Sequence, residues 1–379
     1  MTYDAIVIGG GVVGASIAYH LVSAGARTLL LDRADPGRAT AAGAGILTAE
    51  TNGRASDAWM DFAVAAVDYY PALVAQLHAE QAGETGYAIC GQIEVAIDED
   101  EVAPFDQARD WMLAQQRRRG SPAQEDLHEI GAEDARALFP PLAPIRRALY
   151  YRNAARVDGR LLTEALRRAA LARSLVVRPA SVDRLVVEAG AVVGVIAEGD
   201  TYAAASVAIA GGAWSPRFAE QLGVQIPVEP SRGQIIHLGL PGTDTRDWPL
   251  ITAFHGHYIV AWPDSRVVVG ATRELGTGFD ARTTAAGVHE VLGEALRVAP
   301  GLRGAEVREI RVGLRPYSTV DGLPVLGSVP GLRNVYLATG HGAGGLHLGP
   351  YSGKLVAELM LGQPIEADLS MFEVSRFSS

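Results

Sequence analysis

The fold is decided near the start of the chain, by DAIVIGGGVVGASIAYHLVSAGARTLLLD at residues 4–32. Residues 4–8 are expected to form a short strand, and its apolar residues 5–8 are typical of a strand buried on both faces of a parallel sheet. A helix is expected over 15–24, ended by Gly25, and a second apolar strand follows and ends at Asp32. The order strand, turn, helix, strand predicts the βαβ unit of a doubly wound α/β sheet.

The turn in this unit carries the pattern G-x-G-x-x-G, formed by Gly9, Gly11 and Gly14. The first glycine permits the tight turn, the second lets the backbone approach a pyrophosphate, and the third lets the helix pack close to the strand. Free N–H groups at the helix N-terminus favour phosphate, and Asp32 is placed to bind a ribose hydroxyl. The pattern predicts a dinucleotide site, although by itself it does not choose between NAD and FAD.

Composition excludes several other classes of protein. The 379 residues include 43 glycines, a single cysteine (Cys90) and a formal net charge of −10. One cysteine excludes an internal disulfide, a cysteine-held zinc site and an iron–sulfur cluster, and we expect no metal. The acidic balance argues against a nucleic-acid partner, which selects for basic patches.

Residues 5–26 carry no formally charged side chain and are long enough to span a bilayer. No lysine or arginine precedes them, as a signal peptide would require, and Gly9, Gly10, Gly11 and Gly14 would weaken a spanning helix. We therefore expect a cytoplasmic protein without membrane insertion.

The rest of the chain alternates between helical and strand-like patterns. Buried strands return near 205–210 and 334–339, far from the first strand, so the nucleotide domain is expected to be discontinuous. Its predicted segments are 1–80, 146–222 and 308–379, with a mainly antiparallel substrate domain formed by 81–145 and 223–307. Helices are expected at 57–80, 100–120 and 158–173, a half-buried strand at 91–97, and hairpins across Gly190 and across 263–265.

A second glycine motif lies near the C-terminus, at Gly340, Gly342 and Gly345. The chain ends too soon after it for a second βαβ unit, so a second nucleotide is rejected. We expect this loop, and a helix over about 350–361, to face the reactive ring of the first cofactor. A helix N-terminus stabilises negative charge, which a reduced flavin carries at its N1–C2=O end and a reduced nicotinamide does not. The second motif therefore favours FAD.

Several segments together resemble the D-amino-acid-oxidase superfamily of FAD-dependent amine oxidoreductases, and within it most closely the glycine oxidases. The similarity runs along nearly the whole chain. It implies a Rossmann-type FAD domain and a mainly antiparallel substrate domain, α+β overall. The segments are VIGGGVVGASIAYHL, GRATAAGAGIL, VDGRLL, IAGGAWS, YIVAW with VVVGAT, VGLRP with DGLPVLG, and ATGHGAGGLHLGP.

The resemblance implies a set of cofactor contacts. Relatives that tether flavin covalently use a cysteine late in the chain, which is absent here, so FAD is expected to be noncovalent. The implied contacts are Gly9, Gly11, Val12, Val13 and Gly14 at the pyrophosphate; Asp32 and Arg33 at the ribose; Ala39, Thr40, Ala44, Gly45, Ile46 and Gly212 along the cofactor; Val182 at the adenine; and His341, Gly342, Ala343, Gly344, Gly345, Leu346 and His347 around the flavin.

The implied reaction is hydride transfer from the substrate Cα–H to flavin N5. Arg315, in the segment GLRP, matches the family arginine that binds the substrate carboxylate, and Tyr258 matches the tyrosine that donates a second hydrogen bond. Arg273 follows a predicted strand and is a candidate for the same pocket. For His341 a backbone contact to the cofactor is favoured over a role as catalytic base.

The chain departs from the glycine oxidases at Ala343, where they carry a second arginine. Losing a long cationic side chain should open space over the flavin, so we expect a substrate larger than glycine, such as an N-substituted glycine. Its oxidation gives an imine that hydrolyses to glyoxylate and an amine, while O2 is reduced to H2O2.

Three alternatives remain at this stage. They are a D-amino-acid dehydrogenase that passes electrons to a quinone, a tRNA-modifying oxidoreductase, and a flavoprotein without turnover. The expected partners are a small amine or amino acid and O2, and self-association is left open.

Overall fold

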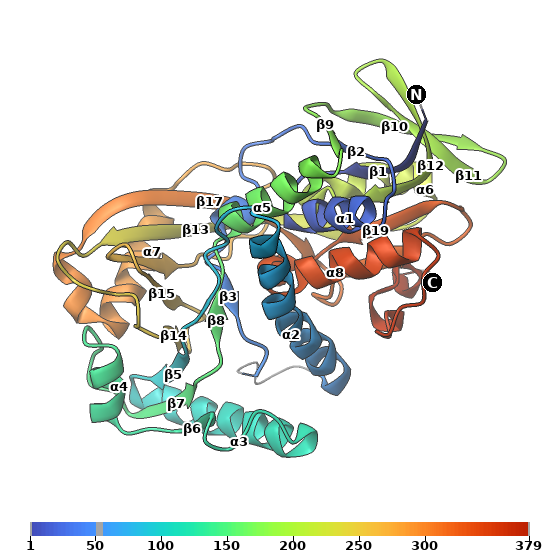
Figure 1. The fold of residues 1–379 in the computed structure, drawn as a ribbon. Helices are drawn as coiled ribbons and strands as arrows, with labels where there is room; N and C mark the ends of the chain where they lie inside the picture. The colour runs from blue at the N-terminus through green and yellow to red at the C-terminus, as the bar shows by residue number, and fades with distance from the viewer. Residues whose placement is uncertain (1, 51–55, 378–379) are drawn as a thin grey trace.

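The computed structural model describes residues 2–50 and 56–377, and these form two large sheets and one small one. Figure 1 shows the two large sheets at opposite ends of the molecule, with helix α2 (Asp57–Ala79) running between them. Both termini lie at the end that holds the first sheet. The architecture confirms the predicted α/β class.

The first sheet contains the predicted βαβ unit. Strand β12 lies beside β1, and the β1–β2, β1–β12, β2–β9 and β12–β19 pairs are all parallel. The β10–β11 hairpin and β18 add antiparallel pairs. The strands are β1 (Thr2–Ile8), β2 (Thr28–Leu31), β9 (Val176–Arg178), β10 (Val182–Glu188), β11 (Ala191–Ala197), β12 (Asp200–Ile209), β18 (Val325–Ser328) and β19 (Val335–Thr339).

Three helices cover one face of this sheet: α1 (Val12–Ser23), α5 (Gly159–Ala172) and α8 (Gly345–Met360) (Figure 1). Helices α1 and α8 approach closely because Gly353 presents no side chain to Ser16. A Cβ added at Gly353 would lie 2.6 Å from the Ser16 Cβ, and the Ser16 hydroxyl donates a hydrogen bond to the Pro350 carbonyl at 2.7 Å. This contact places the C-terminal loop against the N-terminal turn.

Helix α8 begins at Gly345, earlier than the predicted start near 350. Pro350 has no N–H, so it cannot bond the carbonyl four residues back, at Leu346. The Tyr70 hydroxyl of α2 donates to that carbonyl instead. A contact from another helix therefore allows the proline inside α8, which no local pattern could reveal.

The second sheet is mainly antiparallel and carries helix α7 (Ala285–Val298) and helix α4 (Ala132–Leu138) on one face, with α3 (Val102–Arg119) at the other. In spatial order its strands are β17 (Glu306–Ser318), β13 (Val228–Gly239), β16 (Arg266–Gly270), β15 (Tyr258–Trp262), β14 (Leu250–Ala253), β5 (Gln92–Ala96), β7 (Arg147–Tyr151) and β6 (Leu127–Glu129).

The small sheet joins the two halves, with β8 (Ala155–Arg156) between β3 (Ile46–Leu47) and β4 (Ala88–Ile89). Two strands that the predicted boundaries assign to the nucleotide domain, β7 and β17, pair within the second sheet. Strand β17 is at the edge of that sheet and pairs with β13, whereas β7 lies between β5 and β6. The domain boundaries themselves stay a prediction.

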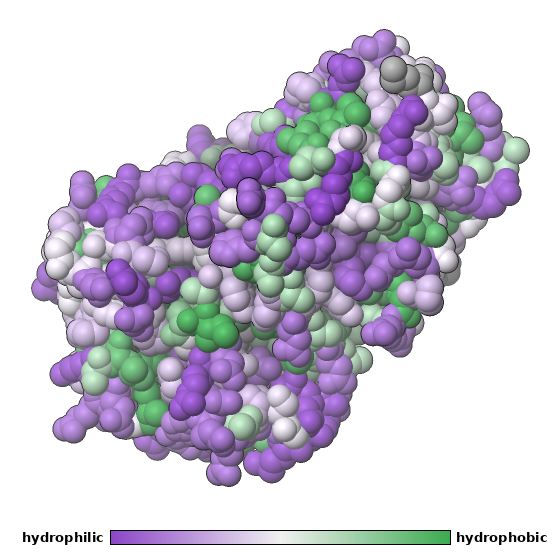
Figure 2. Space-filling view, in the orientation of Figure 1, coloured by the Kyte–Doolittle hydropathy of each residue, from purple (hydrophilic) through white to green (hydrophobic). Residues whose placement is uncertain are grey.

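Helices α2, α3 and α5 confirm the helices expected at 57–80, 100–120 and 158–173 within two residues at each end. Most of the face seen in Figure 2 is hydrophilic, with small separate apolar patches. Among the helices of residues 2–50 and 56–377, none combines the length and the apolar character that crossing a membrane requires.

The glycine at the start of α1 provides a stability test. A Cβ at Gly14 would lie 1.9 Å from the Gly9 carbonyl oxygen, which is backbone and cannot move aside. We expect Gly14→Ala to lower the free energy of unfolding by about 1–3 kcal/mol or more. In the control Gly293→Ala, an exposed site in α7 where an added Cβ meets nothing, stability should stay equal or rise by up to about 1 kcal/mol. Denaturant unfolding measures both, and equal stability of the two variants would contradict this packing.

His20 of α1 provides a pH test. Its Nδ1 donates to the Ser16 carbonyl and its Nε2 accepts from the Tyr69 hydroxyl, each at 2.7 Å. Burial lowers its pKa to about 4. Between pH 6.5 and 4 the unfolded chain therefore binds more protons than the folded one, so stability should fall as pH falls through this window and level off below it. From pH 7 to 4, the free energy of unfolding should decline less steeply in His20→Gln than in wild type. In the control His289→Gln, at an exposed residue, it should decline as in wild type.

Candidate active site

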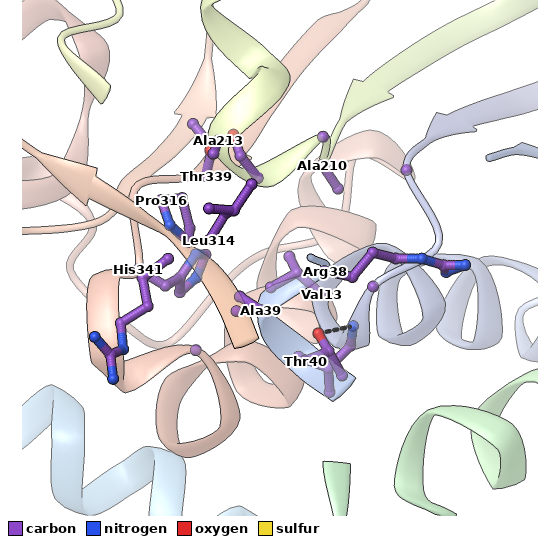
Figure 3. A pocket seen from close by; sticks show the side chains of 18 of the residues that line it. Val13, Arg38, Ala39, Thr40, Ala210, Ala213, Leu314, Pro316, Thr339 and His341 are labelled. Carbon is purple, nitrogen blue, oxygen red and sulfur yellow. Dashed lines mark hydrogen bonds between the residues drawn. The ribbon is translucent and has the colours of Figure 1, made fainter. Parts of the chain in front are cut away.

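A deep cavity is lined by residues of both large sheets and the loops beside them, with about 1580 Å³ of empty space, its open mouth included. Its walls come from the turn after β1, the 38–46 loop, the 3-10 turn at Gly212–Phe218, the end of β17 and residues 338–346. Figure 3 shows Arg38, Ala39 and Thr40 facing this space from one side and His341 with Pro316 from another. Segments far apart in sequence thus share one long pocket.

The glycine turn forms a close-fitting wall of this cavity. Gly9 has φ +103°, and a Cβ there would lie 2.4 Å from the Ala210 carbonyl oxygen. A Cβ at Gly10 would lie 2.6 Å from an Asp32 carboxylate oxygen. No side chain caps the N-terminus of α1, so its first N–H groups are available to an anion, apart from that of Val12, which donates to Thr40 Oγ1 at 3.1 Å.

Asp32 lines the cavity where the sequence predicts a ribose contact. Its carboxylate accepts from Arg38 Nη1 at 2.9 Å, while Arg33 pairs with Asp35 at 2.7 Å. Arg38 also lines the cavity and holds the acid in place from the opposite side of the turn. The sequence analysis did not single out Arg38, although it lies in the quoted segment GRATAAGAGIL.

The C-terminal loop forms the facing wall. His341 is 5% exposed, and neither of its ring nitrogens has a partner among the residues the structure describes. Burial lowers its pKa to about 4, so the imidazole is neutral near pH 7. A neutral imidazole can donate one hydrogen bond and accept another, which makes His341 a polar contact for whatever fills the cavity.

Arg315 lies at the other end of the cavity, on β17. Its guanidinium covers Gly233, where a Cβ would lie 2.3 Å from Cζ, and Nη1 donates to the Thr272 carbonyl at 2.8 Å. Burial lowers the pKa of Arg315; the nearby Tyr258 opposes this and Arg273 adds to it. The group stays charged, because the pKa of an arginine is far above neutral.

Tyr258 and Arg273 line the same end of the cavity. Burial raises the pKa of Tyr258, against the opposing effect of Arg315 and Arg273, so the phenol remains a hydrogen-bond donor. Among residues 2–50 and 56–377, no carboxylate lies within ion-pair distance of Arg315 or Arg273. The nearest acid in sequence, Glu274, is already paired with Arg232 at 2.6 Å. Arg315 and Arg273 therefore line this pocket without an ion pair to any of these carboxylates, although the charge of Glu274 partly offsets the effect of burial on the pKa of Arg315.

Most of the residues that the sequence proposes lie together in the cavity. They are Gly9, Gly11, Val12, Val13, Asp32, Arg33, Ala39, Thr40, Ala44, Gly45, Ile46, Val182, Gly212, Tyr258, Arg273, Arg315, His341, Gly342, Ala343, Gly345 and Leu346.

Three of the proposed cofactor residues do not line it. Gly14 packs behind the turn against Gly9, and a Cβ at Gly344 would meet Leu348. His347 points away, with Nε2 2.9 Å from the Ala63 carbonyl and its ring edge-on to Trp59. Successive residues of α8 point in different directions, so Leu346 and His347 cannot both face the cavity.

Gly43, in the quoted segment GRATAAGAGIL, also lines the cavity and leaves room where Leu346 approaches. Other parts of the wall were not predicted from the sequence: Gly313 leaves room for Ala42, and Trp214 and Leu314 add apolar surface. Cys90 is not among the lining residues.

These features fit a dinucleotide that carries a flavin. A side chain at Gly9 or Gly10 would collide with the turn's own neighbours, so the turn is shaped for backbone contact with a phosphate group. The start of α8 and the unpartnered ring of His341 meet the opposite end, where a flavin ring would lie.

Comparison with known proteins agrees with this geometry. Residues 4–359 match the family described as FAD dependent oxidoreductase. An uncharacterized oxidoreductase of Bacillus subtilis is 38% identical, with 97% of each chain covered, and the glycine oxidase of Geobacillus kaustophilus is 31% identical over 99% of this chain and 97% of its own.

Solved structures give the same result. The iminodiacetate oxidase of Chelativorans sp. superposes with a TM-score of 0.92 at 36% identity, covering 97% of this chain and 98% of its own. The Geobacillus kaustophilus glycine oxidase superposes with a TM-score of 0.90 at 28% identity, with 99% of both chains covered. The glycine turn, the long cavity and these likenesses together show that the chain belongs to the FAD-dependent oxidoreductase family and is an amine oxidoreductase of the glycine oxidase type.

Proposed function

We propose that the protein oxidises N-substituted glycines, and specifically those whose nitrogen substituent carries a second carboxylate. The observation behind this proposal is the pair of cations, Arg315 and Arg273, that line one end of the cavity and form no ion pair with a carboxylate of the described residues. Two carboxylates on one substrate would neutralise both. Iminodiacetate is the simplest compound of this kind.

Arg315 is suited to bind the carboxylate of the glycyl unit that reacts. Its guanidinium is fixed by Gly233 and by the Thr272 carbonyl, so its remaining N–H groups project as a rigid fork. The Tyr258 phenol, kept protonated by burial, is suited to donate a further hydrogen bond to the same carboxylate. Fixing this group at two points orients the adjacent Cα–H.

Arg273 is suited to the second carboxylate. It is more exposed than Arg315, and it lies next to Gly256, where a Cβ would be 2.8 Å from Nη1. On the C-terminal loop, Ala343 contributes only a methyl group to the wall. The pocket therefore combines space beside Ala343 with a positive charge near its mouth, as an extended anionic substituent requires.

The overall reaction balances without further reactants. FAD, when bound, accepts a hydride from the substrate carbon, and water then hydrolyses the resulting imine. For iminodiacetate, substrate, water and O2 give glyoxylate, glycine and H2O2. We also propose that FAD binds noncovalently, because Cys90, the single cysteine of the chain, lies outside the cavity wall. O2 as the electron acceptor and a cytoplasmic location are part of the same proposal.

The relatives support this class of substrate. Iminodiacetate oxidase and glycine oxidase are named for substrates that contain a glycyl unit. The two differ in the acidic group on the nitrogen, which is the feature we assign to Arg273. The alternative is a D-amino-acid dehydrogenase, which would pass the electrons to a quinone or another acceptor and not to O2.

Removing Arg315 tests the carboxylate site. We expect Arg315→Ala to lower kcat/KM for iminodiacetate and glycine alike by roughly 30-fold to several thousandfold, since losing a buried charge partner costs about 2–5 kcal/mol. Arg308→Ala, on the same strand but outside the cavity wall, should behave as wild type. Steady-state kinetics with the FAD content of each variant matched would show this, and unchanged kcat/KM in Arg315→Ala would refute the role.

Removing Arg273 tests the second carboxylate. In anaerobic titrations, bleaching of the flavin absorbance should require less iminodiacetate than glycine in wild type. In Arg273→Ala the concentration of iminodiacetate needed should rise by roughly threefold to thirtyfold, while that of glycine should change little. Arg273→Lys should recover part of the loss. Equal effects on both substrates would contradict the role of Arg273 in binding a second carboxylate. They would not contradict the role of Arg315 in binding the glycyl carboxylate.

A further inference from the structure

The loop between β16 and α7 is anchored at both ends by one buried arginine. Arg232 is 6% exposed and pairs with Glu274 at 2.6 Å and with Asp280 at 3.1 Å. Gln234 adds hydrogen bonds to Glu274 at 2.8 Å and to Thr284 at 2.9 Å. The segment from Glu274 to Asp280 is therefore held at both ends on the second sheet.

The loop also contacts two segments that form part of the cavity wall. The ring of Phe279 stacks on Trp214, with centroids 5.1 Å apart and planes at 26°. Ala281 lies against Gly37, where an added Cβ would be 2.7 Å from the Ala281 Cβ. Trp214 lines the cavity, and Gly37 immediately precedes Arg38, which also lines it.

The position of Phe279 is hard to explain by packing alone. Its side chain remains 53% exposed, so it contributes little to a hydrophobic core. Among the described residues, its ring contact is with Trp214, which belongs to the 3-10 turn Gly212–Phe218 that follows β12 of the first sheet. Gly37 is tied to the second sheet as well, because its carbonyl accepts from the Leu314 N–H at 2.8 Å. The loop thus connects the second sheet to Trp214 and Gly37, and none of residues 274–281 is among the residues that line the cavity.

We propose that residues 274–281 are a clasp that retains FAD, with Phe279 bracing Trp214 and Ala281 bracing the turn before Arg38. The clasp acts on two segments of the cavity wall at once and is held by Arg232. In this proposal the clasp opposes a separation of these two wall segments, and such a separation would ease the exit of the cofactor. Because only FAD binding is involved, the inference stands whether or not the substrate proposal is correct.

The test is the rate at which FAD leaves the holoenzyme. After dilution of purified holoenzyme, the rise of free-flavin fluorescence should be roughly threefold to tenfold faster in Phe279→Ala than in wild type, the range expected for loss of one aromatic contact. Phe279→Tyr keeps the ring and should release FAD as wild type does. Leu275→Ala is the matched control, because Leu275 is an apolar residue of the same loop and is 57% exposed.

A release rate in Phe279→Ala equal to that of wild type would overturn the clasp. So would an equal acceleration in Leu275→Ala, since that would show a general effect of loop composition. Thermal unfolding of the FAD-depleted variants separates a loss of folding from a loss of retention. As an independent measurement on wild type, amide hydrogen exchange at 275–281 should slow when FAD is bound, and equal exchange with and without FAD would also overturn the proposal.

Discussion

The crossing of β1 and α1 at Gly14 is the constraint on which the rest of the structure depends. The helix approaches the strand so closely that an added Cβ would lie 1.9 Å from the Gly9 carbonyl and 3.3 Å from the Ala210 side chain. This closeness sets the direction of α1 over the sheet, with its free N–H groups facing the cavity. Helix α8 then crosses α1 at Gly353 and Ser16, which brings the C-terminal loop opposite the glycine turn.

The net charge at each end of the cavity depends on which arginines form ion pairs with acidic side chains. Near the glycine turn, Arg38 and Arg33 have Asp32 and Asp35 as partners. At the other end, Glu274 is used by Arg232 to anchor a loop, which leaves Arg315 and Arg273 to face the pocket. Arg315 is partly buried, so a carboxylate meets its charge in a low dielectric, whereas Arg273 is exposed and solvent weakens its attraction. Among the described residues, Glu274 is thus paired with Arg232, which holds the loop, and forms no ion pair with Arg315 or Arg273.

Much of the fold and of the candidate site could be predicted because the signals are local. The apolar run at 4–8, the spacing of Gly9, Gly11 and Gly14, and the periodicity of α2, α3 and α5 each depend on neighbours in the chain. The family resemblance added Arg315 and Tyr258, which no spacing rule would have chosen. The family assignment also removes the alternative of a flavoprotein without turnover.

Other features depend on partners distant in the sequence. The acceptance of Pro350 inside α8 needs the hydroxyl of Tyr70, and the pairing of β17 in the second sheet needs β13. His347 follows Leu346 in the same motif, yet the packing of α8 against α2 turns it towards Ala63.

The sequence by itself determined the nucleotide unit and favoured flavin, because a glycine turn and strand–helix order are written in consecutive residues. The family resemblance implied many of the other residues of the cavity wall. Only the tertiary structure decided which cations remain unpaired, which side chains of the C-terminal helix face the cavity, and which loop braces its walls. These features depend on contacts between side chains of segments far apart in the sequence. A local sequence pattern does not show which distant segments come into contact.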